Sequence, residues 1–295
     1  MAKTDKATKT PVDPKHDHSP KKEGLDRKED GTLEITIIVP WTQAQKAQDS
    51  IENELVKSVK IAGFRPGQAP KNVAKARLNP ELVKEEVLKK VVGAAYNEAI
   101  TKYKLTPIIS PQIHIEIFTE GTDIQFTAQT CEEPVVELGK YKEDVAKVTA
   151  KSKIIVPGKE EGKVDLDAIL EAALKAAKIT IPNVLIESET SRLLSQMLDE
   201  LKKLGLTLEQ YLSSKNIDVE KLRDEYKLKA ENDLKLEFLL RKIADEEKIT
   251  VGKEDIEKAL ASIENPTERE EIMKNPYLVA SIIRQQKTVT FLSTL

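Results

Sequence analysis

Between two helical patterns the chain reads Gly63-Phe64-Arg65-Pro66-Gly67-Gln68-Ala69-Pro70. Arg65 to Gln68 have the residues of a type II turn, because proline fixes φ at the second position and glycine accepts a positive φ at the third. Such a turn would hold Phe64 and Arg65 at a rigid tip. From Leu55 to Pro80 the chain has no acidic residue, and its cations there are Lys57, Lys60, Arg65, Lys71, Lys75 and Arg77.

Two interpretations of this turn are open. An aromatic side chain and an arginine on a preorganised tip, surrounded by cations, suit docking to a mixed RNA and protein surface. Phe64 would then fill a pocket, and Arg65 would pair with a phosphate or a carboxylate. The alternative is a solvated helix-to-helix turn whose Phe64 folds back into the core, and turn chemistry alone slightly favours it.

The segment before the turn predicts a strand followed by a helix. Alternating apolar side chains over 33–39 indicate a strand, which Pro40 ends. Thr42 and Gln45 form a capping-box signal, and apolar residues then recur at helical spacing. The pattern predicts a helix over about 42–62.

The segment after the turn predicts a second helix and a hairpin. Asn79 is a favourable N-cap with Pro80 at the first helical position, and two neighbouring apolar ridges indicate a largely buried helix. Residues 113–117 and 124–128 alternate on either side of a polar turn, as in a β-hairpin. Together these elements predict a small antiparallel sheet with a long helical pair on one face, an α+β domain over 31–140.

The rest of the chain divides into a tail, a linker and a helical domain. Residues 1–30 are highly charged with almost no large apolar side chain, which predicts a disordered tail. Residues 141–163 are rich in lysine, glutamate and glycine and predict a linker. Capping signals over 164–295, among them Thr207 with Gln210, predict an all-α domain with extended helical arms. Its expected helices lie near 165–178, 182–204, 207–214, 218–247, 252–264, 266–274 and 276–293.

The composition argues against an enzyme. The 295 residues carry 47 basic and 50 acidic side chains, a net charge of −3, which excludes whole-protein basicity as a reason to bind nucleic acid. Cys131 is the single cysteine, and the three histidines are His16, His18 and His114. A single cysteine cannot form an intrachain disulfide or a cysteine zinc site. The three histidines offer little support for histidine-based catalysis. With no glycine-rich phosphate-binding motif either, we expect no catalytic residues, no metal site and no cofactor.

The sequence also lacks the signals of a secreted or membrane protein. No apolar segment follows Met1, and no apolar run approaches the roughly 20 residues that a membrane helix needs. We therefore expect a soluble, cytoplasmic protein with no membrane partner.

The turn and its flanking elements resemble a known family. The string Gly63-Phe64-Arg65-x-Gly67-x-x-Pro70 is similar to the ribosome-docking signature of trigger factor, the bacterial ribosome-associated chaperone, usually written G-F-R-x-G-K-x-P. The order strand, helix, signature, helix, hairpin resembles the family's ribosome-binding domain over 31–140. Residues 160–295 resemble its C-terminal chaperone domain.

Two departures from the family pattern matter. Gln68 stands where the family normally has a lysine, and Pro66 where it often has one, so Lys60, Lys71 and Lys75 would have to replace the lost cations. The family also normally inserts an FKBP-type prolyl isomerase domain of around a hundred residues, for which only 141–163 is available. An FKBP-like pocket is lined with aromatics, and no aromatic residue occurs between Tyr141 and Tyr211. The resemblance therefore implies a form that lacks the isomerase domain.

The resemblance implies an ATP-independent chaperone that docks beside the exit tunnel of the large ribosomal subunit, on a ribosomal protein and rRNA, and holds nascent or unfolded polypeptides. The implied docking residues are Gly63, Phe64, Arg65, Pro66, Gly67, Gln68, Pro70, Lys60, Lys71 and Lys75. Candidate client contacts on the apolar helix faces are Leu194, Met197, Leu201, Leu234 and Phe238, each of which fits an intradomain core equally well.

Three further possibilities stay open. With two signature cations missing, the protein could work away from the ribosome as a free chaperone or assembly factor with a degenerate docking loop. The second possibility is a remaining prolyl isomerase activity, which the short linker disfavours. The third is a homodimer that forms away from the ribosome.

Overall fold

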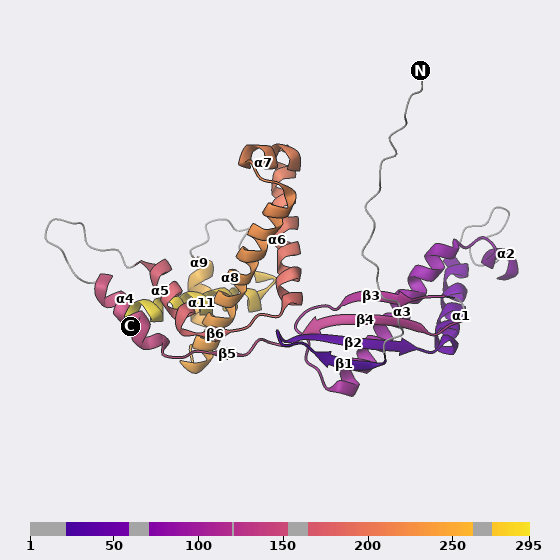
Figure 1. Ribbon diagram of the computed structural model, residues 1–295, viewed down its shortest axis with the longest axis horizontal. Helices are drawn as coiled ribbons and strands as arrows, with labels where there is room; N and C mark the ends of the chain where they lie inside the picture. The colour runs from indigo at the N-terminus through magenta and orange to yellow at the C-terminus, as the bar shows by residue number, and fades with distance from the viewer. Residues whose placement is uncertain (1–21, 59–70, 120, 153–164, 262–272) are drawn as a thin grey trace, which may run out of the picture. The chain divides into compact units, whose positions relative to one another are not determined.

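The computed structural model describes residues 22–58, 71–119, 121–152, 165–261 and 273–295. Within these ranges the chain forms two units (Figure 1). The first unit contains residues 34–105 and 112–129 together with the segment up to Asp26, and the second contains residues 27–33, 106–111 and 130–295. The division falls after Gln129, before the boundary expected near 140, because Cys131 and Leu138 are buried among apolar residues of the second unit.

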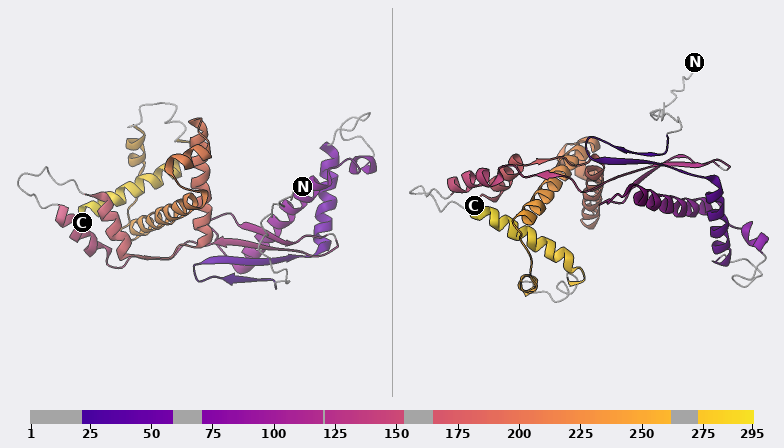
Figure 2. Two further views of the ribbon diagram at one scale, coloured as in Figure 1. Left: turned by 45° about the horizontal axis from the view of Figure 1, so that its top comes forward. Right: turned by 90° about the horizontal axis from the view of Figure 1, so that it is seen from below.

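The first unit is built on a sheet and two long helices. Its elements are β1 (Gly24–Arg27), β2 (Thr32–Val39), α1 (Trp41–Ser58), α2 (Lys71–Lys75), α3 (Pro80–Tyr103), β3 (Gln112–Ile117) and β4 (Ile124–Cys131). The strands form a four-stranded antiparallel sheet in the order β1-β2-β4-β3, and α3 runs across one face of it (Figure 2). The α+β fold class expected from the sequence is confirmed.

The start of α3 is set by the expected local signals, whereas the capping box expected at Thr42 and Gln45 is wrong, because Thr42 lies inside α1. The side chain of Asn79 accepts a hydrogen bond from the backbone N–H of Glu81, and Pro80 begins α3. At the start of α1, the acceptor comes from elsewhere, because the backbone N–H of Trp41 donates to Oδ1 of Asp123 at 2.9 Å. The expected end of α1 near residue 62 lies outside the described residues.

The strand β1 is a difference from the sequence analysis, which assigns residues 1–30 to a disordered tail. Its four residues pair with β2 at the sheet edge. A short tight turn connects the two strands, in which the backbone N–H of Gly31 donates to the carbonyl oxygen of Lys28 at 3.0 Å. Backbone pairing holds this strand, whose one large apolar side chain is Leu25, too little for an alternating pattern, and composition alone therefore misses it.

The hairpin of β3 and β4 is confirmed, with one irregularity. Ile113 and Ile115 face Ala128 and Phe126 in the register expected for alternating strands. The register then shifts, so that Ile117 faces Gln125 instead of continuing the apolar row. Glu116 lies at this β-bulge, and its carboxylate accepts hydrogen bonds from the side chains of Gln125 and Thr127.

The second unit is mostly helical, as expected. Its elements are β5 (Val136–Glu137), α4 (Tyr141–Ser152), α5 (Leu166–Ala176), β6 (Lys178–Ile179), α6 (Asn183–Lys203), α7 (Leu208–Lys215), α8 (Val219–Glu246), α9 (Lys253–Ala261) and α11 (Pro276–Thr294). The capping box predicted at Thr207 and Gln210 is formed in both directions. The helix expected over 266–274 falls almost entirely outside the described residues.

The helix α4 replaces part of the expected linker. Composition suggested a linker over 141–163, but residues 141–152 form a helix whose Val145 is fully buried. This side chain belongs to a cluster that includes Ile169 of α5, Leu239 of α8 and Leu292 of α11. Packing against distant helices therefore stabilises α4, and no local signal reveals such packing.

Candidate interaction surfaces

The predicted docking turn lies largely outside the described residues. Lys60 and the signature residues Gly63, Phe64, Arg65, Pro66, Gly67, Gln68 and Pro70 are all in the undescribed range 59–70. Lys71 begins α2, but its side chain is not described either. Of the predicted docking cations, Lys75 is the one whose side chain lies in the described part of the structure.

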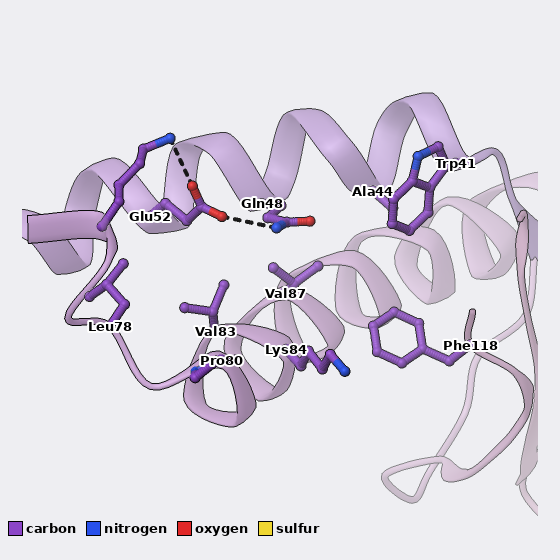
Figure 3. A pocket seen from close by; sticks show the side chains of 11 residues that line it. Trp41, Ala44, Gln48, Glu52, Leu78, Pro80, Val83, Lys84, Val87 and Phe118 are labelled. Carbon is purple, nitrogen blue, oxygen red and sulfur yellow. Dashed lines mark hydrogen bonds and ion pairs between the residues drawn. The ribbon is translucent and has the colours of Figure 1, made fainter. Parts of the chain in front are cut away.

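Lys75 is engaged by an acidic residue of α1. Its Nζ lies 2.8 Å from an oxygen of Glu52, whose other oxygen accepts a hydrogen bond from Gln48 at 2.9 Å (Figure 3). The hydrogen bond from Lys75, followed by that from Gln48, holds the pKa of the Glu52 carboxyl below its usual range. The same pair raises the pKa of Lys75. Lys75 is thus charged but already paired, which weakens its case as a free cation for phosphate.

Two other cations of the segment from Leu55 to Pro80, which has no acidic residue, are more exposed than Lys75. Lys57, near the end of α1, and Arg77, after α2, are both exposed. They lie on either side of the turn in sequence.

The five candidate client contacts are packed inside the second unit. Met197 and Leu201 are buried with Leu222, and Leu194 packs against them. Leu234 and Phe238 are buried in a separate cluster with Ala230 and Val184. Four of the five are only 7% exposed. In this conformation they contribute to packing, and a client would reach them only if their clusters opened.

Other apolar side chains of the second unit are exposed and were not singled out from the sequence. Tyr277 is 86% exposed, and Leu278 and Ile282 on the same helix are more than half exposed. A second group lies near the ends of α6 and α8, and its members are Leu198, Leu204, Leu206, Val219 and Leu228. The available signal was that α11 begins with apolar residues on all sides, more than one buried face requires.

Tyr277 lies beside a cavity between α8 and α11. The cavity has a volume of about 740 Å³ and is lined by Leu240 and Ala244 from α8, the segment 249–251, and Tyr277 and Ala280 from α11. Arg284 fixes its wall, because Nε donates to the carbonyl oxygen of Ile249 at 2.8 Å and Nη2 lies 2.7 Å from Asp245. Lys287 lies 2.6 Å from Asp255 and ties the start of α9 to the same helix. The lining thus combines apolar side chains with the charged side chains of Glu237, Arg241 and Arg284.

The described residues form no cluster that could hold a metal ion. In the ranges that the structure covers, no three His, Cys, Asp or Glu side chains lie close enough together to hold a metal ion. None of the helices described there is long and apolar enough to cross a membrane. Cys131 is fully buried, and this burial raises the pKa of its thiol to about 11.

The fold therefore defines a class of two-part proteins, in which an α+β unit precedes a helical unit with exposed apolar side chains. Residues 23–169 match the family described as "Bacterial trigger factor protein (TF)", and residues 160–294 match "Bacterial trigger factor protein (TF) C-terminus". The two matched ranges overlap over 160–169, and no FKBP-type isomerase family is found. The chain belongs to the trigger factor family of chaperones.

Individual relatives match over shorter stretches. Trigger factor of Natranaerobius thermophilus is 31% identical over 110 residues, which cover 37% of this chain and 25% of the relative. Trigger factor of Staphylococcus epidermidis is 30% identical over 117 residues, which cover 40% of this chain and 27% of the relative. The matched region thus spans about a quarter of the length of these curated relatives.

A solved structure shares the fold over almost the whole chain. It is described as "Promiscuous Substrate Recognition in Folding and Assembly Activities of the Trigger Factor Chaperone" and aligns with a TM-score of 0.61. The alignment covers 92% of this chain and 99% of that chain, at 17% sequence identity. This similarity confirms the fold, including both units.

Proposed function

We propose that the protein is an ATP-independent chaperone of the cytoplasm that holds unfolded or nascent polypeptides on its helical unit and docks on the large ribosomal subunit through the 63–70 turn. The observation that carries the holding function is the group of exposed apolar side chains beside the α8–α11 cavity, centred on Tyr277. Membership of the trigger factor family supports it. Holding by many weak apolar contacts requires no nucleotide.

The holding surface is tested by removing its apolar side chains. The double variant Tyr277→Ser and Ile282→Ser should suppress the aggregation of a chemically denatured protein less than the wild type does, as measured by light scattering. The matched control is Gln286→Ser, an exposed polar side chain on the same helix. Full protection by the double variant would exclude this surface as the main holding site.

The buried side chains that the sequence suggested as client contacts are tested separately, with Leu201 as the example. If Leu201 contacts clients, its cluster must open, and Leu201→Ala should reduce holding beyond what lower stability explains. If Leu201 is only packing, Leu201→Ala lowers the free energy of unfolding by about 2–5 kcal/mol, as for other buried leucines. Holding measured well below the unfolding temperature of the variant then stays at the wild-type level.

Ribosome docking is tested by co-sedimentation with purified large ribosomal subunits. Replacing Phe64 and Arg65 by alanine should abolish pelleting, while the helical circular dichroism and melting temperature stay near the wild type. Raising the salt concentration should weaken wild-type binding, because contacts to phosphate release counterions. If the double variant melts early, Phe64 belongs to the core and the turn is structural.

A second candidate is a chaperone or assembly factor that works away from the ribosome. Two observations favour it: Gln68 stands where the family signature normally has lysine, and Lys75 is held by Glu52. Glu52→Gln should then release Lys75 and tighten binding to ribosomal subunits, and Gln68→Lys should do so as well. If wild type and both variants all fail to pellet, the ribosome-independent function is the better one.

We also propose that the chain has no prolyl isomerase activity. The two matched families together cover residues 23–294, and neither of them is an FKBP-type isomerase domain. The test uses a substrate protein whose refolding rate is limited by proline isomerisation. That step is slow enough to be followed after manual mixing. Acceleration at catalytic amounts of the protein would overturn the proposal.

A further inference from the structure

The first unit contains a cavity of about 300 Å³ between α1, the start of α3 and the residue that follows β3 (Figure 3). Trp41 and Phe118 lie at the same end of it (Figure 3). Ala44, Val83 and Val87 form its apolar wall, and all three are at least nine-tenths buried. A cavity of this size and lining suits a small ligand with an apolar body.

The charged groups of this cavity are not balanced. The carboxylate of Glu52 already accepts from both Lys75 and Gln48. Lys84 also lines the cavity, and its side chain extends toward the end that holds Phe118 (Figure 3). Lys84 is exposed, and none of the ion pairs between described residues includes it. The cavity therefore offers an aromatic end beside an exposed ammonium group.

We propose that this cavity binds a small carboxylic acid with an apolar body, its ring or alkyl chain between Trp41 and Phe118 and its carboxylate on Lys84. A carboxylate satisfies the ammonium of Lys84 and fits a lining in which two lysines accompany one glutamate. An organic cation would be repelled by Lys84, because Glu52 already balances the charge of Lys75. A neutral apolar ligand would fill the space but form no ion pair with Lys84, whose exposed ammonium would stay hydrated.

The chain supplies its own reporter for this site, because Trp41 is its single tryptophan. The probes are 4-phenylbutyrate, its neutral amide and 4-phenylbutylamine, which differ mainly in the charge of one end. Tryptophan emission of the full chain should change saturably with 4-phenylbutyrate, with a dissociation constant on the order of 1 mM for a ligand of this size. Ligand-observed NMR should show the same order of affinity, with acid above amide and amide above amine.

Two variants locate the binding. Lys84→Gln should weaken the binding of 4-phenylbutyrate about two- to fivefold, the range for a partly exposed ion pair, and leave the amide unchanged. Lys89→Gln is the matched control, because Lys89 is exposed on the same helix but does not line the cavity. Val87→Phe fills the cavity and should abolish binding of the acid and the amide, with the circular dichroism spectrum confirming that the variant folds.

Each of several outcomes would overturn the proposal. No saturable change with any probe means that the cavity is not a site. Equal affinity for the acid and the amine means that the carboxylate is not recognised. Binding that survives in a folded Val87→Phe variant lies elsewhere, and a change of Trp41 emission caused by an unfolded polypeptide but by none of the small acids marks a protein-binding surface instead.

Discussion

The backbone N–H of Asn183 donates to Oδ2 of Asp30 at 2.8 Å, across 153 residues of sequence. Asn183 is the first residue of α6, and the residue before it, Pro182, has no side chain able to cap the helix. Asp30 lies in the turn between β1 and β2, where it also accepts from the backbone N–H and the hydroxyl of Thr32. One carboxylate thus orders a turn and supplies the N-terminal acceptor that α6 lacks locally.

Asp30→Ala should therefore lower the free energy of unfolding by about 1–2 kcal/mol, as the loss of a helix cap and its hydrogen bonds does elsewhere. Asp30→Asn keeps an acceptor oxygen and should cost less. Urea unfolding measures both, with Glu29→Ala as the control, because Glu29 is a neighbouring carboxylate that is exposed. If Glu29→Ala lowers the free energy of unfolding as much as Asp30→Ala does, the effect comes from the loss of a negative charge and not from the loss of the helix cap.

The same carboxylate predicts a dependence of stability on pH. Burial raises the pKa of Asp30, but the hydrogen bonds from Asn183 and Thr32 outweigh it and hold the pKa below its ordinary value of 3.8. Near pH 4 the unfolded chain therefore binds more protons at this site than the folded chain, so the free energy of unfolding rises with pH there. The contribution of Asp30 is complete above that pH and is lost as the pH falls through the folded-state pKa.

Urea unfolding of wild type and Asp30→Asn between about pH 6 and pH 2.5 checks this sign, because the asparagine does not titrate. The difference in the free energy of unfolding should be constant in the upper part of this range. It should shrink below the ordinary pKa of 3.8. A difference that grows as the pH falls would mean that the pKa of Asp30 is raised.

The sequence predicts the elements that local chemistry controls. The capping box of Thr207 and Gln210 and the N-cap of Asn79 are found where the residue types place them. The acceptors for the first residues of α1 and α6 are Asp123 and Asp30, which are distant in sequence, and no local pattern indicates them. Helix α4 was missed for the same reason.

The candidate sites also differ in whether local sequence or tertiary packing determines them. The docking signature is a local string and can be read directly, although its residues lie outside the described ranges. The client contacts were chosen from regular apolar ridges, and the structure buries Leu234 and Phe238 of those ridges against other helices. Regular ridges are the faces that pack best, so exposed apolar surface is found elsewhere, as at Tyr277. The Trp41 cavity depends on Phe118, which only tertiary structure brings near.

Gly139 makes the turn into α4 possible. Its φ is +56°, and a Cβ at this position would clash with the carbonyl oxygen of Ala176. Gly139→Ala should therefore lower the free energy of unfolding by at least about 2 kcal/mol, more than the roughly 1 kcal/mol of positive-φ strain alone. Gly205→Ala is the control, because Gly205 has a φ of +70° but nothing within 4 Å of its Cβ position. Equal losses would show that the backbone near Ala176 can move aside.

Cys131 should be inert in the folded protein. The thiol is fully buried, and at its pKa of about 11 the thiolate is a very small fraction at pH 8. Ellman's reagent should therefore detect less than a tenth of the thiol within minutes in native buffer, by an order-of-magnitude estimate, and the whole of it in concentrated urea. Because the chain has one cysteine, the signal is unambiguous. Complete and rapid labelling in native buffer would show that the Cys131 cluster opens readily.

Tyr141 connects the start of α4 to the end of α8. Its hydroxyl donates to Glu247 at 2.9 Å, and Lys142 lies 2.6 Å from the same carboxylate. Burial, followed by the hydrogen bond to Glu247, raises the pKa of Tyr141, while Lys142 and Tyr141 lower that of Glu247. Tyr141→Phe should lower the free energy of unfolding by about 1 kcal/mol, because it removes the hydroxyl and keeps the buried ring.

Lys142→Gln is the comparison, since its exposed ion pair should contribute less than about 1 kcal/mol. Urea unfolding of both variants measures the two contributions to the same carboxylate. Hydrogen exchange of the α4 amides then separates local from global loosening, because a local contact protects its own helix first. If Tyr141→Phe changes neither stability nor α4 protection, the hydroxyl contact does not hold this helix, and the buried Val145 side chain must account for its packing.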